Sequence, residues 1–316
     1  MERAHAWRTP EIEDPTNRYL IHPLSWALVG HLARLGVSPN AVSLAGLGSG
    51  IGAALALSHY DKPGWLPLAG ALLLLWHILD GADGQLARLT GRSSELGKIL
   101  DGLCDHGTFA ALYVSLAWKA SSWWGAWAWV LAVLAALSHF VQANAYELQR
   151  QLYDYWVYGK PSARPEDPDE LRARLARARG PMVLFLLLYY AYVRLQRWVR
   201  SSYGAIEMYW NALQDPEARQ EVRNLLRRYQ APMVRLWGLL SSNYRTAALL
   251  LACALGEPMG FFLWEIAGLN LLLGLLFALQ AGRNRVLLRY MRGGEPTLGM
   301  AAFCLALRSF FIKRRT

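Results

Sequence analysis

Four aspartates in the stretch DGADGQLARLTGRSSELGKILDGLCD, residues 80–105, are spaced so that they could do chemistry together. Asp80 and Asp83 are three residues apart and Asp101 and Asp105 are four apart, so each pair shares one face of a helix. Two such helices packed antiparallel would gather all four carboxylates. Oxygen ligands without His or Cys favour Mg²⁺ or Mn²⁺, and two such ions about 3.5–4 Å apart suit displacement at phosphorus.

The segments around these aspartates are typical of membrane helices. The apolar run LAGALLLLW precedes them and TFAALYVSLAW follows them. A charged side chain left unpaired at the centre of such a helix costs about 2.5–3.5 kcal/mol, so we expect bound metal to compensate the carboxylates. Of all 316 residues, 54% are hydrophobic, above the roughly 45–50% of soluble chains. The sequence therefore predicts an all-α integral membrane protein.

The net charge of +10 has a simple explanation in such a protein. Basic residues beside membrane segments mark cytoplasmic loops that face anionic lipid, so we expect membrane lipids but no nucleic acid among the partners.

The three cysteines lie far apart in apolar surroundings and are expected to fill the core: Cys104, Cys253 and Cys304. The polar N-terminus does not resemble a signal peptide.

The charge pattern predicts six membrane-spanning helices with both termini on the cytoplasmic side. An N-terminal cytosolic segment with an interfacial helix, 1–38, precedes four spans in 39–147. A polar insertion with short helices on the cytosolic side, 148–243, separates these from two further spans in 244–285 and a cytosolic C-terminal tail, 286–316.

Within these regions, the first four spans are expected at about 40–60, 65–88, 97–118 and 123–141. The apolar run 182–193 is about 12 residues long, short of the roughly 17–25 needed to cross, so we expect it to be buried or interfacial. Residues 203–230 are rich in Arg and Glu and predict a surface helix. Glu257 and Pro258 split the apolar stretch 246–282 into a hairpin of two spans.

The aspartate-rich stretch resembles the signature of the CDP-alcohol phosphotransferases, Asp-x2-Asp-Gly-x2-Ala-Arg-x8-Gly-x3-Asp-x3-Asp, at all eight fixed positions. The preceding GVSPNAVSLAG also resembles the Pro-Asn-x-hydrophobic-Ser/Thr start of the first span in that family. The resemblance covers about residues 36–145 and implies six membrane helices around a cytosol-facing site. If the protein is bacterial, this membrane would be the cytoplasmic (inner) membrane. It implies transfer of a substituted phosphate group from a CDP-linked substrate to an acceptor alcohol, with release of CMP. It leaves open whether the protein is a homodimer.

The resemblance also implies roles for individual residues. The acidic positions of the signature would hold two Mg²⁺ or Mn²⁺ ions: Asp80, Asp83, Asp101 and Asp105. Asp105 would also take the proton of the acceptor hydroxyl, with Asp101 and Arg88 beside it in the catalytic set. Arg88 would pair with phosphate or hold the carboxylates. The CDP-linked substrate would lie against positions that are small or acidic: Asp80, Gly84, Ala87 and Gly97.

Polar residues outside the signature allow two interpretations each. His77 and His106 could act in catalysis, but we favour a role as hydrogen-bonded packing residues. Glu265 could bind a polar partner in the bundle or cap the hairpin. Three arginines are expected on the cytoplasmic side, as anchors or as docking points for an acceptor or lipid phosphate: Arg92, Arg150 and Arg245.

Two classes of function stay open. The signature favours a phosphotransferase of phospholipid synthesis, since a divalent-cation transporter or a non-catalytic membrane module has no need of Gly84, Ala87 and Arg88. Within the enzyme class, LGKILDGLCD resembles the branch that uses CDP-choline or CDP-ethanolamine with a lipid acceptor. The modest length and six expected spans fit the branch that uses CDP-diacylglycerol better. The insertion 148–243 could cover the acceptor site.

Overall fold

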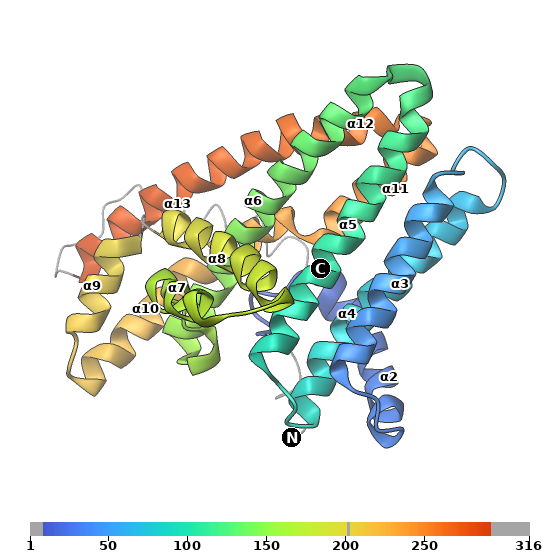
Figure 1. Cartoon of the computed structure of the whole chain (residues 1–316). Helices are drawn as coiled ribbons and strands as arrows, with labels where there is room; N and C mark the ends of the chain where they lie inside the picture. Colours follow the sequence, from blue (N-terminus) through green and yellow to red (C-terminus); the bar gives the residue numbers. More distant parts are fainter. Residues whose placement is uncertain (1–8, 201–202, 292–316) are drawn as a thin grey trace, which may run out of the picture. The chain divides into compact units, whose positions relative to one another are not determined.

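The computed structural model describes residues 9–200 and 203–291. These residues form helices joined by short turns and contain no strand (Figure 1). The predicted all-α architecture is therefore confirmed for this part of the chain. Three predicted features lie outside the described residues in whole or in part: Cys304, the start of the N-terminal segment (1–8) and most of the C-terminal tail (292–316).

The chain divides into two compact units. The first unit comprises Met1–Asn144 and Gly238–Leu273, and the second comprises Ala145–Trp237 and Gly274–Thr316. The signature stretch lies wholly in the first unit, and most of the predicted polar insertion lies in the second.

The first unit begins with a single helical run made of the π-helical turn η1 (Asn17–Ile21) and α2 (His22–Arg34). Asp14 starts this run, because its Oδ1 accepts a hydrogen bond from the backbone N–H of Thr16 at 2.7 Å. Ser25 Oγ on α2 donates to the carbonyl oxygen of Ile78 at 2.7 Å. The helix therefore packs on the helix that carries the first two signature aspartates.

Three long helices follow and position the signature: α3 (Pro39–Leu57), α4 (Trp65–Leu89) and α5 (Glu95–Trp124). Serine caps begin two of them, since Ser38 Oγ accepts from the N–H of Ala41 and Ser94 Oγ from that of Gly97. Helix α3 packs against both α4 and α5 (Figure 1). A methyl group at Gly50 of α3 would overlap Thr108 of α5, so a glycine is needed where these helices meet.

Helix α6 (Ala126–Tyr158) is much longer than the predicted fourth span, which ended near residue 141. Its sequence contains no Gly or Pro that would end the helix within that range. The helix stops before Gly159, whose positive φ of 64° favours glycine. The polarity change after residue 147 is thus a change of surroundings along one helix.

The apolar stretch predicted as a hairpin of two spans folds as two helical runs, of which the second, Pro258–Met291, is long and apolar enough to cross a membrane. Helix α11 (Ser242–Ala254) ends before Gly256, and Pro258 begins a second helical run. That run comprises α12 (Pro258–Leu263), the π-helical turn η5 (Trp264–Gly268) and α13 (Leu269–Met291). The break at Glu257 and Pro258 is therefore confirmed.

Four helical runs in the described residues are long and apolar enough to cross a membrane: Pro39–Leu57, Trp65–Leu89, Ala126–Tyr158 and Pro258–Met291. The number of six spans is not confirmed. Helix α11 has 13 residues, which rise about 20 Å against the roughly 30 Å of a hydrocarbon core. Helix α5 carries charged residues through its first half, among them Lys98, Asp101 and Asp105.

The second unit contains four helices of 9 to 22 residues, of which α7 and α10 are strongly charged: α7 (Pro168–Arg177), α8 (Pro181–Arg200), α9 (Gly204–Ala212) and α10 (Pro216–Trp237). Single 3-10 turns precede α7 at Pro161–Ala163 and follow α10 at Gly238–Leu240. Helix α7, with 10 residues, is one of the short helices predicted within the polar insertion 148–243. The surface helix predicted over 203–230 is two helices, because Asp215 caps a new one at Pro216.

Candidate functional site

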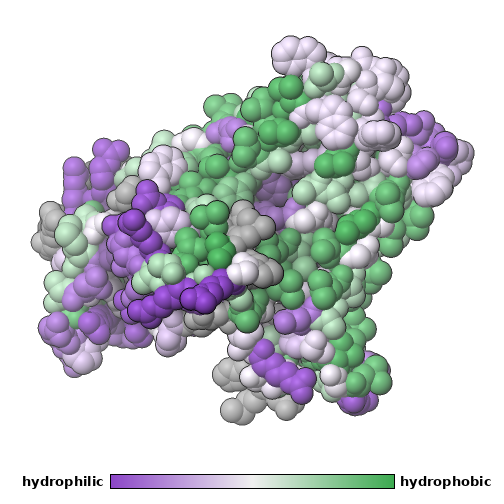
Figure 2. Space-filling view, viewed as in Figure 1, coloured by the Kyte–Doolittle hydropathy of each residue, from purple (hydrophilic) through white to green (hydrophobic). Residues whose placement is uncertain are grey.

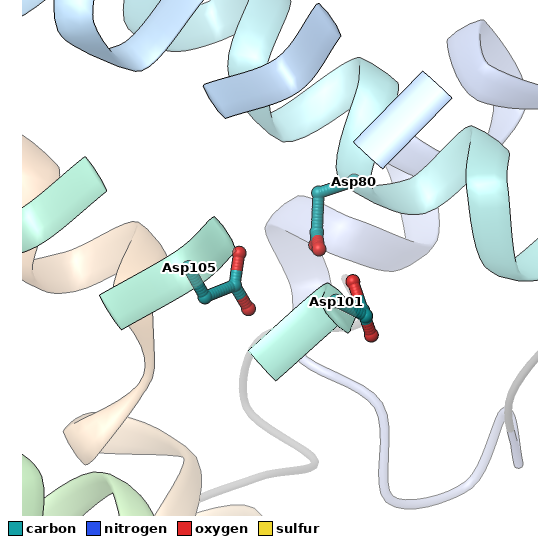
Figure 3. A group of neighbouring side chains, drawn as sticks. All are labelled: Asp80, Asp101 and Asp105. Atoms are coloured by element: carbon teal, nitrogen blue, oxygen red, sulfur yellow. The ribbon is translucent and has the colours of Figure 1, made fainter. Parts of the chain in front are cut away.

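Helices α4 and α5 bring three signature carboxylates to one place. One oxygen each from Asp80, Asp101 and Asp105 lies within 4.8 Å of the other two. Figure 3 shows the three side chains pointing toward one another, Asp80 from α4 and the others from α5. Each is half-buried, so the group stays accessible to solutes while part of its hydration is removed.

The fourth signature carboxylate is held differently. Asp83 is 4% exposed, and its Oδ2 accepts a hydrogen bond of 2.5 Å from Ser43 Oγ on α3. It lines the same small cleft as the other three, together with residues of α3, α4 and α5: Ser43, Gly46, Trp76 and Cys104. The structure thus gathers all four aspartates around one cleft and gives one of them a hydroxyl donor.

This donor set fits a hard divalent cation. Carboxylate oxygens up to 4.8 Å apart can share an ion at about 2.0–2.6 Å after small side-chain rotations. Four carboxylates in one cleft repel one another, and a cation among them relieves that repulsion. The Asp cluster could therefore bind a metal ion, as the spacing in the sequence predicts.

The other signature residues lie on the same two helices. Gly84, Ala87 and Arg88 continue along α4 toward its C-terminus. Arg88 is exposed, and its Nη1 lies 3.3 Å from the point where a Cβ on Gly84 would stand. Gly97 is in the first turn of α5, where a Cβ would lie 3.3 Å from Asn40 Oδ1. Nothing in these contacts tests their predicted role toward the CDP-linked substrate.

The two histidines near the cleft have packing partners. His77 is 8% exposed, its Nε2 lies 2.8 Å from Thr246 Oγ1, and its ring contacts that of Trp76. The His106 ring lies 5.4 Å from that of Phe140 and 6.2 Å from that of His139. These contacts support the interpretation of both histidines as packing residues.

Glu265 has a polar partner in the bundle. Its carboxylate forms an ion pair with Arg245, and both side chains are almost completely buried, at 0% and 1% exposed. Arg245 also donates to the carbonyl oxygen of Leu240, and Gln142 donates to the backbone carbonyl of Glu265 at 3.1 Å. Arg245 is thus enclosed in the bundle, where a phosphate at the surface does not reach it.

The other two arginines differ from Arg245 and from each other. Arg92 is exposed after the C-terminus of α4. Arg150, in the second unit, is 9% exposed, and its Nη1 lies 3.3 Å from Glu147 Oε2. Only Arg92 keeps a position from which an anionic substrate or lipid could be bound directly.

Four residues of the cleft were not assigned a function from the sequence: Ser43, Gly46, Trp76 and Cys104. Ser43 is the last residue of the Pro-Asn-x-hydrophobic-Ser segment. That motif placed Ser43 at the start of the first span but did not indicate that it binds Asp83. Cys104 was expected to fill the core, and it is a buried free thiol that lines the cleft. Its position one residue before Asp105 was the available signal.

Acidic side chains gathered between membrane-type helices are typical of one class of protein, the integral membrane proteins that carry a carboxylate cluster able to bind a metal ion. The sequence profile of the CDP-alcohol phosphatidyltransferases matches residues 36–209. The chain belongs to this family. Its family and its apolar helices mark it as a multi-pass membrane protein.

Curated relatives match a shorter part of the chain. A phosphatidylinositol phosphate synthase of Mycobacteroides abscessus is 31% identical over 118 residues, which are 37% of this chain and 50% of the relative. The phosphatidylinositol phosphate synthase of Corynebacterium glutamicum is 34% identical over 28% of this chain and 38% of its own length. A CDP-alcohol phosphatidyltransferase class-I family protein of Dictyostelium discoideum is 30% identical over 37% of this chain and 32% of its own length.

The chain thus spans half or less of the length of these relatives. No solved structure matches the chain.

Proposed function

We propose that the protein transfers a substituted phosphate group from a CDP-linked lipid to an acceptor alcohol and releases CMP, in phospholipid synthesis. The observation that carries this proposal is the convergence of Asp80, Asp101 and Asp105, whose oxygens lie within 4.8 Å of one another. These are acidic positions of the family signature. Their convergence supports a working site more strongly than the signature alone.

We assign a division of labour among the site residues. Asp80, Asp83, Asp101 and Asp105 would hold Mg²⁺ or Mn²⁺, and two ions fit four carboxylates. The metal would neutralise the pyrophosphate and improve CMP as a leaving group. Asp105 would take the proton from the acceptor hydroxyl as that oxygen attacks phosphorus.

The remaining signature residues would bind the nucleotide. Gly84, Ala87 and Gly97 lack bulk that would keep cytidine from the helices. Arg88 would pair with a phosphate, and its exposed guanidinium beside Gly84 supports this role. Asp101 would orient the reacting groups together with Asp105.

We further propose that the site faces the cytoplasm, with six membrane crossings and both termini inside. The two crossings beyond the four long apolar runs would be α5 and the run 238–256, in which the 3-10 turn Gly238–Leu240 lengthens the 13-residue α11. The predicted division at 38, 147, 243 and 285 would then separate membrane helices from cytosolic segments. A homodimer stays a prediction, which no feature of the described chain supports.

The donor we favour is CDP-diacylglycerol. Two relatives are named phosphatidylinositol phosphate synthases, and a phosphatidyl group comes from that donor. An inositol phosphate is therefore the first acceptor to test. The alternative is a transferase that uses CDP-choline or CDP-ethanolamine with a lipid alcohol. A cation transporter or non-catalytic module is the remaining candidate.

The test is CMP release by the purified chain in detergent, with a panel of donors and acceptors. We expect turnover with CDP-diacylglycerol and an inositol phosphate, its loss after EDTA, and its recovery with Mg²⁺ or Mn²⁺. Turnover with CDP-choline and diacylglycerol alone would select the other branch. Full activity after rigorous chelation would contradict the metal assignment. Absence of CMP release with every donor and acceptor pair would contradict the proposed transferase activity.

A further inference from the structure

Helices α7 and α8 of the second unit form a helical hairpin that the site does not use. We call residues 168–200 the basic hairpin. The two helices pack through buried Leu171, Leu186 and Val193, and Gly180 turns the chain between them with φ +64°. Asp169 and Arg197 also connect them, at 3.3 Å. These contacts hold α7 and α8 together, so the basic hairpin has a packed side and an exposed side.

Helix α8 has one side packed on the second unit and one side exposed. Val193 and Val199 are each 2% exposed, and Gln196 donates to Gln151 of α6 at 3.2 Å. The exposed side carries a row of residues at helical spacing: Val183, Leu187, Ala191, Arg194 and Trp198. Leu187 is 50% and Trp198 64% exposed. This row, the α8 stripe, is about 22 Å long at 1.5 Å per residue.

Helix α7 adds positive charge beside the stripe. Every arginine from 172 to 179 is exposed: Arg172, Arg174, Arg177 and Arg179. Residues 168–200 contain seven arginines, no lysine and only two acidic residues, Asp169 and Glu170. In Figure 2, hydrophobic side chains gather where Figure 1 places α8, with hydrophilic side chains along α7 next to them.

We propose that the basic hairpin binds the surface of an anionic lipid bilayer, with the α8 stripe among the headgroups and the arginines on their phosphates. An apolar stripe with a tryptophan at one end and arginines around it is the composition of interfacial helices. Arginine near its C-terminal end can extend its charge to the interface while its stem covers apolar surface. This proposal does not depend on the phosphotransferase chemistry.

The charge favours lipid over a protein partner. Anionic phosphate arrays attract basic segments by about fivefold in affinity for each arginine near the surface. A protein partner of the same stripe would need its own row of carboxylates to match these arginines, whereas the headgroups of an anionic bilayer supply phosphates at every position. The expected occupant is therefore anionic phospholipid, and a protein is the competing outcome.

The experiment uses the full chain in nanodiscs with and without phosphatidylglycerol. A photoreactive residue is introduced as Leu187→p-benzoylphenylalanine, and adducts are identified by mass spectrometry. We expect a lipid adduct that increases with phosphatidylglycerol. The same residue introduced as Glu221→p-benzoylphenylalanine, at an exposed acidic position of α10, should give little lipid adduct.

Charge variants complete the test. Arg174→Gln with Arg177→Gln should lower the phosphatidylglycerol-dependent adduct at residue 187 by at least fivefold. The matched pair Arg228→Gln with Arg235→Gln, two exposed arginines of α10, should leave it unchanged. Protein adducts at residue 187, absence of lipid adducts, or an equal loss in both charge variants would each overturn the proposal.

Discussion

The first unit gathers buried charge in two regions that balance it in different ways. In the Arg245–Glu265 ion pair, the chain supplies both opposite charges, and the two side chains are 1% and 0% exposed, respectively. At the cleft, four carboxylates converge, and Asp80, Asp101 and Asp105 keep partial access to solvent. One region pairs unlike charges in the interior, whereas the other gathers like charges at an opening.

This difference indicates what each region does. Removing one partner of an enclosed pair leaves a buried charge, so the pair is important for stability. Like charges held together oppose folding unless something else stabilises them, and a bound cation does so. We therefore expect changes at the cleft to act mainly on activity and changes at the pair to act mainly on stability.

The largest effect should follow Asp105→Asn. If Asp105 takes the acceptor proton, the rate of CMP release should fall by about 10²–10⁴-fold. Affinity for the CDP-linked substrate should persist, because three carboxylates and the residues proposed to bind the nucleotide remain. Calorimetry of substrate binding beside the CMP assay measures both quantities.

Two comparisons interpret that variant. Asp80→Asn should weaken both substrate binding and metal binding. The control is Asp61→Asn, which should change neither, because Asp61 lies away from the cleft and its Oδ1 pairs with Lys119 Nζ at 2.8 Å. Equal loss of substrate affinity in Asp105→Asn and Asp80→Asn would mean that Asp105 acts as a metal ligand and not as the base. Near-normal turnover in Asp105→Asn would remove it from the reaction.

The next effect should follow Arg245→Met, which leaves Glu265 buried without its partner. Breaking such a pair costs about 3–5 kcal/mol, so thermal unfolding in detergent should occur at a much lower temperature. Adding Glu265→Leu should recover much of that loss, because two apolar side chains replace the ion pair. Turnover measured below the unfolding temperature should stay close to that of the unchanged chain.

The exposed Glu257 at the start of α12 provides the control for this pair. Glu257→Gln should leave the unfolding temperature unchanged. A double variant as unstable as the sum of the two single variants would show that the pair is not energetically coupled.

The smallest effect should follow Ser43→Ala, because Asp83 combines features of both regions. Asp83 belongs to the cleft but is buried and bound by the chain's own hydroxyl at 2.5 Å. Loss of a group that orients a metal ligand typically weakens metal affinity by about 10–100-fold. Direct Mn²⁺ titration, together with the metal dependence of CMP release, measures this loss.

Ser49→Ala is the matched control on the same helix. Ser49 is buried to a similar degree and donates to the carbonyl oxygen of Leu72 at 2.8 Å, away from the carboxylates. Its removal should not change Mn²⁺ affinity. Equal Mn²⁺ affinity in the Ser43→Ala chain would mean that Asp83 needs no help to face the cleft.

The sequence predicted the helical fold and the convergence of the carboxylates because both follow from local periodicity. Asp101 and Asp105 share a helix face wherever that helix lies, and a short connection brings it back beside Asp80. The contacts of Ser43 with Asp83 and of Arg245 with Glu265 join residues on different helices. No spacing along the chain encodes such pairs, so the sequence left Glu265 with two interpretations and Ser43 with none.

Helix ends were predicted well where a proline marks them, as at the start of the first span near residue 40 and at the Glu257–Pro258 break. The end of α6 was wrong because polarity was taken as the boundary. A helix ends where its backbone can no longer continue, which here is Gly159. The lengths of α6 and α11 could not be read from hydropathy for this reason.

The π-helical turn Trp264–Gly268 makes the end of the chain adjustable by single residues. Such a turn holds one residue more than an α-helical turn, and each residue rotates a helix by about 100°. Gln142 fixes both sides of it, with its amide donating to the carbonyl of Glu265 at 3.1 Å and to Asn270 Oδ1 at 2.7 Å. Loss of one residue here would therefore restore an α-helical turn and rotate α13 by about 100° relative to α12, so the face that α13 presents depends on the length of this turn.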